Sequence, residues 1–147
     1  MKKYLLLFTF CLALAFQAFA QTAGEMDAIL ASQGVSYDQA ARFVLQAADV
    51  ANLSSSEAFS FTQEQKWLPA SASSGEQARL DSLSLLIMRA FEMKGGLLYS
   101  VTKSPHYAYR ELMYKGIIVG RVDPHMAVSG EELLFILGRV LSGTEDA

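Results

Sequence analysis

Ser100 and Lys103 stand in the sequence Ser-Val-Thr-Lys, the candidate for nucleophilic catalysis in this chain. A lysine one helical turn after a serine can take the proton of the serine hydroxyl. The Ser-Asp-Asn and Lys-Thr-Gly sequences that accompany such a pair in known serine enzymes do not follow. Ser100 also comes soon after Gly95, in a stretch that we expect to be a loop. The sequence therefore favours a polar connector, with a small periplasmic serine hydrolase as the alternative.

Aromatic and basic residues gather in one part of the chain, where they could bind a ligand. Four tyrosines fall within 16 residues, accompanied by basic residues that include Arg110 and Lys115: Tyr99, Tyr107, Tyr109 and Tyr114. A tyrosine has a flat apolar face and a polar tip, which suits carbohydrate or protein recognition. Tyr107 and Arg110 are therefore candidate binding residues. The alternative places Tyr107 and Tyr114 in the core and Tyr109 on a solvent-exposed helix face.

The two histidines, His106 and His125, match no spacing that is typical of metal ligands. Metal sites need three or four converging ligands, so a zinc site would require acidic neighbours as well. Gly116 and Gly120 belong to a Gly-Ile-Ile-x-Gly turn and lack the following Lys-Ser of a phosphate-binding loop. The sequence predicts neither a metal nor a cofactor, and no enzymatic activity.

Composition excludes two classes of protein. Of 147 residues, 52% are hydrophobic and 18% charged, which excludes a disordered chain. The formal net charge is −3, which argues against a nucleic-acid-binding protein.

Residues 1–20 have the pattern of a secretory signal peptide. Two lysines follow the initial Met, an apolar run fills residues 4–16, and Ala18 and Ala20 form the small-residue cleavage site before Gln21. An uncleaved membrane anchor is the alternative, although the apolar stretch is shorter than the ~20 residues of a span. We expect an exported protein that is periplasmic or associated with the cell envelope, with no membrane span after cleavage.

Cleavage would leave residues 21–147 as a single domain. Its 10 basic and 15 acidic residues give a net charge of −5, and Cys11 would leave with the signal peptide. An exported domain without disulfides depends on its hydrophobic core for stability.

Helix signals dominate the rest of the chain. Ser36, Ser54, Ser74 and Ser129 each precede Gln or Glu by three residues, as in a capping box. Ser104 precedes Pro105, which is favoured at the first position of a helix. These signals predict an all-α protein with six helices and, at residues 117–119, a short strand or buried extended turn. The expected helices cover residues 25–33, 36–49, 55–67, 75–94, 105–115 and 129–142.

Three segments begin alike and continue with a similar apolar pattern. They start at Val35, Ala78 and Val128, so the spacings are 43 and 50 residues. Repeated units of this size pack against one another because one unit cannot bury its own apolar face. We therefore expect a compact bundle of about three helix-loop-helix repeats, with a possible pseudo-threefold arrangement.

The third unit, residues 104–141, resembles the S-layer homology family. Tyr107-Ala108 corresponds to the Trp-Ala pair that begins the first helix of that family's repeat, and residues 116–120 match its Gly-Ile-Ile-x-Gly turn. Asp123 resembles the following loop, and residues 128–132 stand for the motif that opens the second helix.

The resemblance implies a structural or anchoring module whose partner is cell-wall polymer or another envelope protein. In the family an arginine of the helix-opening motif contacts anionic wall polysaccharide. That motif position falls here at Tyr37, Leu80 and Gly130. Arg79, one position earlier, and Arg121, in the turn, are the nearby cations and complete the set of candidate binding residues.

Overall fold

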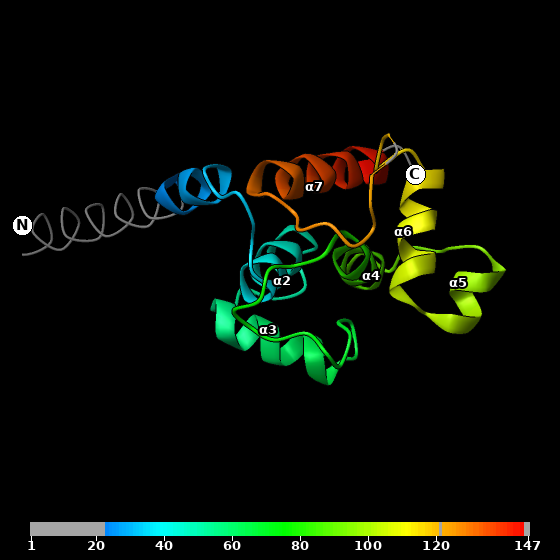
Figure 1. Cartoon of the computed structure of the whole chain (residues 1–147), viewed down its shortest axis with the longest axis horizontal. Helices are drawn as coiled ribbons and strands as arrows, with labels where there is room; N and C mark the ends of the chain where they lie inside the picture. Colours follow the sequence, from blue (N-terminus) through cyan, green and yellow to red (C-terminus); the bar gives the residue numbers. More distant parts are fainter. Residues whose placement is uncertain (1–22, 121, 146–147) are drawn as a thin grey trace, which may run out of the picture.

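The computed structural model describes residues 23–120 and 122–145, and within these ranges all regular secondary structure is helical (Figure 1). Residues 23–30 form the first helix, and two isolated β-bridges join loop segments. The expected all-α fold is thus confirmed. The other helices are α2 (Tyr37–Ala47), α3 (Ser55–Glu64), α4 (Leu80–Ala90), α5 (Leu97–Thr102), α6 (Pro105–Tyr114) and α7 (Gly130–Glu145).

Serine caps begin four of these helices where the sequence predicts them. Ser36 and Ser54 form capping boxes at α2 and α3. Ser104 Oγ accepts a hydrogen bond from the backbone N–H of Tyr107 at the start of α6, and Ser129 Oγ does the same for the third residue of α7. These caps satisfy N–H groups that have no partner within the helix.

The capping box predicted at Ser74 starts no helix, and the single helix expected over residues 75–94 is wrong. The helix α4 begins only at Leu80, because the preceding segment is extended and pairs with other parts of the chain. Gln77 forms a β-bridge with Ser36, and Arg79 forms one with Ala127. These pairings use the backbone groups that the first turn of a longer helix would need.

The starts of the three repeats form a closed ring of backbone hydrogen bonds. The N–H of Ala78 donates to the carbonyl of Val35 (2.8 Å), and the N–H of Val35 donates to that of Val128 (2.9 Å). The N–H of Val128 in turn donates to the carbonyl of Ala78 (2.9 Å), which closes the ring. All three residues are fully buried. The three repeats therefore meet around one point, in the expected threefold manner.

The core surrounds α4, the most deeply buried of the long helices. Ten of its eleven residues are buried, because neighbours cover it on nearly every side. It packs against α2 on one side and α6 on the other, while α3 and α7 pack on α2 (Figure 1). Burial of these apolar faces is the main favourable contribution to folding.

Residues 117–119 form a bend rather than a strand, with Ile117 and Ile118 buried and Val119 exposed. The N–H groups of both isoleucines donate to the carbonyl of Leu112 at the end of α6. Gly116, with a positive φ of 71°, lets the chain reverse at this point.

None of the helices in the described residues is long and apolar enough to cross a membrane.

Candidate functional site

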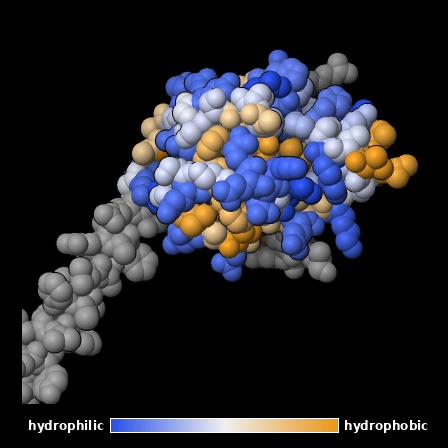
Figure 2. Space-filling model, turned by 90° about the horizontal axis from the view of Figure 1, so that it is seen from below, coloured by the Kyte–Doolittle hydropathy of each residue, from blue (hydrophilic) through white to orange (hydrophobic). Residues whose placement is uncertain are grey.

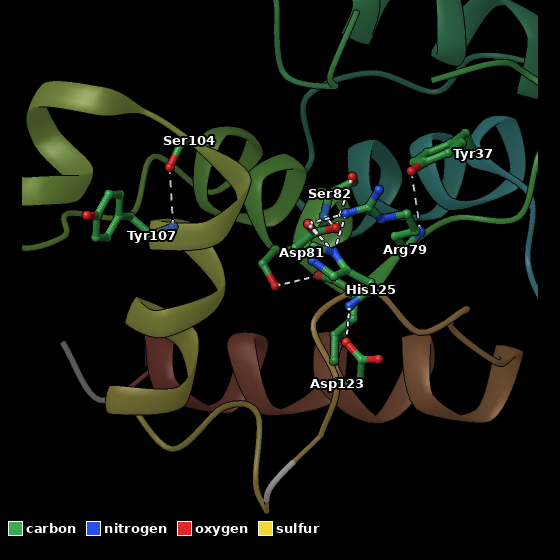
Figure 3. Close-up of polar contacts among 10 residues, drawn as sticks. Tyr37, Arg79, Asp81, Ser82, Ser104, Tyr107, Asp123 and His125 are labelled. Carbon is green, nitrogen blue, oxygen red and sulfur yellow. Dashed lines mark hydrogen bonds and ion pairs between the residues drawn. The ribbon is translucent and has the colours of Figure 1, made fainter. Parts of the chain in front are cut away.

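Arg79, Asp81 and His125 converge where the second repeat meets the third (Figure 3). Arg79 Nη2 donates to Asp81 Oδ2 at 2.7 Å, and His125 Nδ1 lies 3.2 Å from the same oxygen. Arg79 Nη2 and His125 Nδ1 are also in direct contact. One carboxylate thus gathers two side chains that can carry positive charge.

Backbone pairing between the repeats holds this cluster in place. The N–H of Leu80 donates to the carbonyl of Met126, and that of Asp81 donates to the carbonyl of Pro124 at 2.8 Å. The loop is fixed further by Asp123, whose Oδ1 accepts a hydrogen bond from the N–H of His125. His125 therefore reaches Asp81 although the two lie 44 positions apart in the chain.

The carboxylate of the cluster is internal, whereas its basic partners face solvent. Asp81 is 5% exposed and accepts hydrogen bonds from both the N–H and the hydroxyl of Ser82. The side chain of Arg79 is 44% exposed and that of His125 64%. A buried carboxylate is stable when it is paired and hydrogen-bonded, and its place in the first turn of α4 adds the favourable end of the helix dipole.

A groove of about 240 Å³ lies beside the cluster, lined by the starts of α2, α4 and α6 and by the segment before α4. Tyr37 contributes its hydroxyl, which accepts a hydrogen bond from the N–H of Arg79 at 3.5 Å. The guanidinium of Arg79 has five N–H donors, more than its contacts with Asp81 and His125 use. The groove can therefore offer hydrogen bonds to hydroxyl or carboxylate groups. Its lining consists of Tyr37, Pro69, Ser71, Ala72, Glu76, Arg79, Asp81, Ser82 and Pro105.

Two of the other predicted binding residues lie apart from this groove. Tyr107 is half-buried on α6, packs edge-on against His106, and points away from the cluster (Figure 3). Arg110 is exposed on α6 and does not line the groove. Arg121, the proposed signal peptide of residues 1–20 and the cleavage site at Ala20 and Gln21 lie outside the described residues.

The three positions at which the family resemblance implies an arginine are buried. Tyr37 is 4% exposed, Leu80 is fully buried, and Gly130 has no room for a side chain. A Cβ on Gly130 would lie 1.6 Å from the carbonyl oxygen of Ile29. Arg79 instead reaches solvent, because it is the N-cap residue of α4, just before the buried face begins.

Tyr114, which the sequence placed in the core as an alternative, is exposed, and Tyr109, which it placed on the surface, is buried. Tyr109 is 7% exposed and its hydroxyl donates to the carbonyl of Val122 at 2.6 Å, whereas Tyr114 is 89% exposed. The reason is the direction of α6, which turns Ala108, Tyr109 and Leu112 toward the core. Burial, followed by the nearby charge of Asp123, raises the pKa of Tyr109 above its ordinary value. Tyr109 is thus a structural residue.

Ser100 lies on the short helix α5 and not in a loop, so this expectation is wrong. Gly95 and Gly96 are followed directly by α5, which packs on α6, and not by a coil. Ser100 Oγ donates to the carbonyl of Gly95 (3.2 Å), while Lys103 Nζ lies 4.6 Å from the centre of the Tyr99 ring. The serine and the lysine are therefore engaged by different partners.

The described residues contain no group of three or more His, Cys, Asp or Glu that could hold a metal ion.

Of the residues that line the groove, the sequence indicated Arg79 as a candidate for binding. It did not indicate Tyr37, Asp81 or Ser82 as binding residues. Asp81 offered a local signal, because it lies two residues after Arg79 at the start of an apolar helix. Nothing in the local sequence places His125 beside it.

No protein-family model, no curated protein and no solved structure matches this chain.

Proposed function

We propose that this protein is a non-catalytic, exported module of the bacterial cell envelope, built from three repeats like those of the S-layer homology family. Its groove beside Arg79 would bind cell-wall polymer. The observation that carries this proposal is an arginine that faces solvent at a polar groove, one position before the motif arginine of that family.

The chemistry of the groove suits an anionic saccharide. A guanidinium forms short, charge-assisted hydrogen bonds with carboxylate or phosphate groups. Tyr37 and Ser82 add hydroxyl-bearing side chains, and a polymer sugar presents hydroxyl groups of its own. The lining also carries Glu76 and Asp81, so an anionic group would have to bind through Arg79, the one cation among these lining residues.

The hydrolase alternative receives no support from the contacts of Ser100 and Lys103, because each side chain is directed to another partner.

The test is co-sedimentation of the chain from Gln21 onward with isolated cell-wall sacculi that retain their polymer. Arg79→Ala should weaken binding about tenfold or more, as expected for loss of a charge-assisted hydrogen bond. Arg79→Lys keeps a positive charge beside Asp81, so the fold should be retained. It lacks the planar guanidinium, so binding to the polymer should still be weakened. Circular dichroism verifies that each variant is folded.

Two further substitutions serve as controls. Lys66→Ala removes an exposed positive charge outside the groove and should leave binding unchanged. Arg110→Ala tests the other predicted binding face, on α6. Equal binding by Arg79→Ala and the unchanged chain would overturn the assignment of the groove, and capture of an envelope protein instead of polymer would assign the other partner class. Export is checked separately, by the intact mass of a product that begins at Gln21.

A further inference from the structure

The short helix α5 turns its apolar side chains toward solvent. Leu97, Leu98 and Val101 are 79%, 55% and 76% exposed, and their spacing places them on one side of the helix. Tyr99, on the opposite side, is buried and anchors α5 to the rest of the molecule. Apolar atoms protrude at the end of the molecule where Figure 1 shows α5 (Figure 2). Grouped exposed apolar side chains of this kind mark an interaction surface.

The charge around α5 is opposite to that of the whole protein. Residues 92–119 contain four basic and two acidic residues, a net charge of +2, whereas the chain has a net charge of −3. Lys94 and Lys103 flank α5 directly and are exposed. Arg110 lies on α6, the helix against which α5 packs, and Lys115 lies just after that helix. The apolar surface is thus bordered by cations on a protein that is otherwise acidic.

We propose that α5 docks the protein on the surface of an anionic phospholipid bilayer. Leu97, Leu98 and Val101 enter the boundary between headgroups and acyl chains, while Lys94 contacts the anionic headgroups. Lys103, whose Nζ lies over the Tyr99 ring in the free protein, turns toward the headgroups on binding. Segments that bind at a membrane interface combine these two features. Long lysine side chains can keep the charged end among headgroups while their stems lie along apolar surface.

The size and charge of the surface favour lipid over a protein partner. Stable protein–protein interfaces bury more than ~1,200 Å² and have few charges at their centre. Three aliphatic side chains on a six-residue helix, bordered by lysines, are a small patch for that purpose. An anionic bilayer, in contrast, requires only shallow insertion and supplies the complementary charge.

Vesicle co-sedimentation tests the proposal with the chain from Gln21 onward. That chain is used because the apolar run of residues 4–16 would bind lipid by itself, whereas every residue of the core lies between Ile29 and Val140. Binding should be at least ~10-fold stronger to vesicles of phosphatidylcholine with 30% phosphatidylglycerol than to phosphatidylcholine alone, and ~1 M salt should abolish the difference.

Two sets of substitutions assign this binding to α5. Changing Lys94 and Lys103 to Gln should weaken binding about fivefold for each lysine. Changing Leu97, Leu98 and Val101 to Ser should abolish detectable binding, and folding should be retained because all three are exposed. A matched control changes three exposed apolar residues elsewhere, Leu30, Val50 and Phe135, to Ser and should bind like the unchanged chain.

An environment-sensitive fluorophore on Val101→Cys locates the contact. The chain from Gln21 onward has no other cysteine, so labelling is confined to this position. Anionic vesicles should shift its emission to the blue, while the same label at Phe135→Cys should stay unchanged. Equal binding to both vesicle types, unchanged binding by the triple Ser variant, or self-association through α5 without vesicle binding would each overturn the proposal.

Discussion

At the scale of the residue, the chain places charged groups at positions where their surroundings decide their role. Asp81 is buried and gathers Arg79 and His125, so it acts as an internal counter-charge. Glu132, in the first turn of α7, shows the effect of burial on a carboxyl group. Burial raises its pKa above the ordinary value, an effect that a hydrogen bond from the backbone N–H of Ser129 opposes.

This pKa shift of Glu132 predicts a pH dependence of stability. Because the pKa is higher in the folded than in the unfolded chain, the folded state binds the proton more tightly. The free energy of unfolding should therefore fall as pH rises from the ordinary carboxyl pKa of 4.5 to the raised value, through this group's contribution. Glu132→Gln should remove that contribution, as measured by urea unfolding across pH 4–7.

Glu131→Gln is the matched control, since it removes one exposed charge from the same helix turn. If both variants change the pH profile equally, the effect belongs to the helix terminus and not to the burial of Glu132.

At the scale of the element, the start of α7 lies directly against the helix of residues 23–30. Gly130 makes this possible, because its Cα approaches the backbone of Ile29 and its N–H donates to the carbonyl of Ser32 at 3.0 Å. Glu25 strengthens the same region by pairing with both Nη atoms of Arg42 on α2. As an exposed pair, it contributes only ~0–1 kcal/mol.

Gly130→Ala should destabilise the protein by ~1–3 kcal/mol, because the added methyl group meets backbone that must move. Hydrogen exchange should show the helix of residues 23–30 losing protection first. The control is Gly138→Ala on the same helix, where a Cβ meets no atom within 4 Å and the substitution should stabilise by ~0.5–1 kcal/mol. Similar effects of the two substitutions would contradict the close packing at Gly130.

At the scale of the whole molecule, the three repeats share their central hydrogen bonds. Each repeat start donates one N–H and accepts one through its carbonyl, so removal of any repeat leaves two buried backbone groups without partners. Such groups are costly to bury. In a linear repeat array each unit contacts only its neighbours, whereas here the first repeat also closes on the third.

This closed arrangement predicts a single cooperative unfolding transition. Trp67 is the sole tryptophan and packs edge-on against Phe61 on α3, so its fluorescence reports on α3 and its surroundings. Far-UV circular dichroism reports on all helices. The two transitions should coincide in urea. A fluorescence midpoint clearly below that of circular dichroism would show that α3 and its surroundings unfold independently.

The sequence by itself determined where most helices begin and which positions of the repeats correspond. Ser36, Ser54, Ser104 and Ser129 act as caps through contacts within three residues, so a local signal suffices. The resemblance between repeats likewise depends on apolar spacing that is visible in the sequence.

The tertiary structure alone decided the extended segment before α4, the roles of Tyr109 and Tyr114, and the surroundings of Arg79. Ser74 has a capping pattern, yet the neighbouring backbone pairs with residues about 40 to 50 positions away. Asp81 and His125 meet for the same reason, since the backbone pairing between repeats brings distant loops together. Such long-range pairing depends on how three repeats close around one point, which no short stretch of sequence encodes.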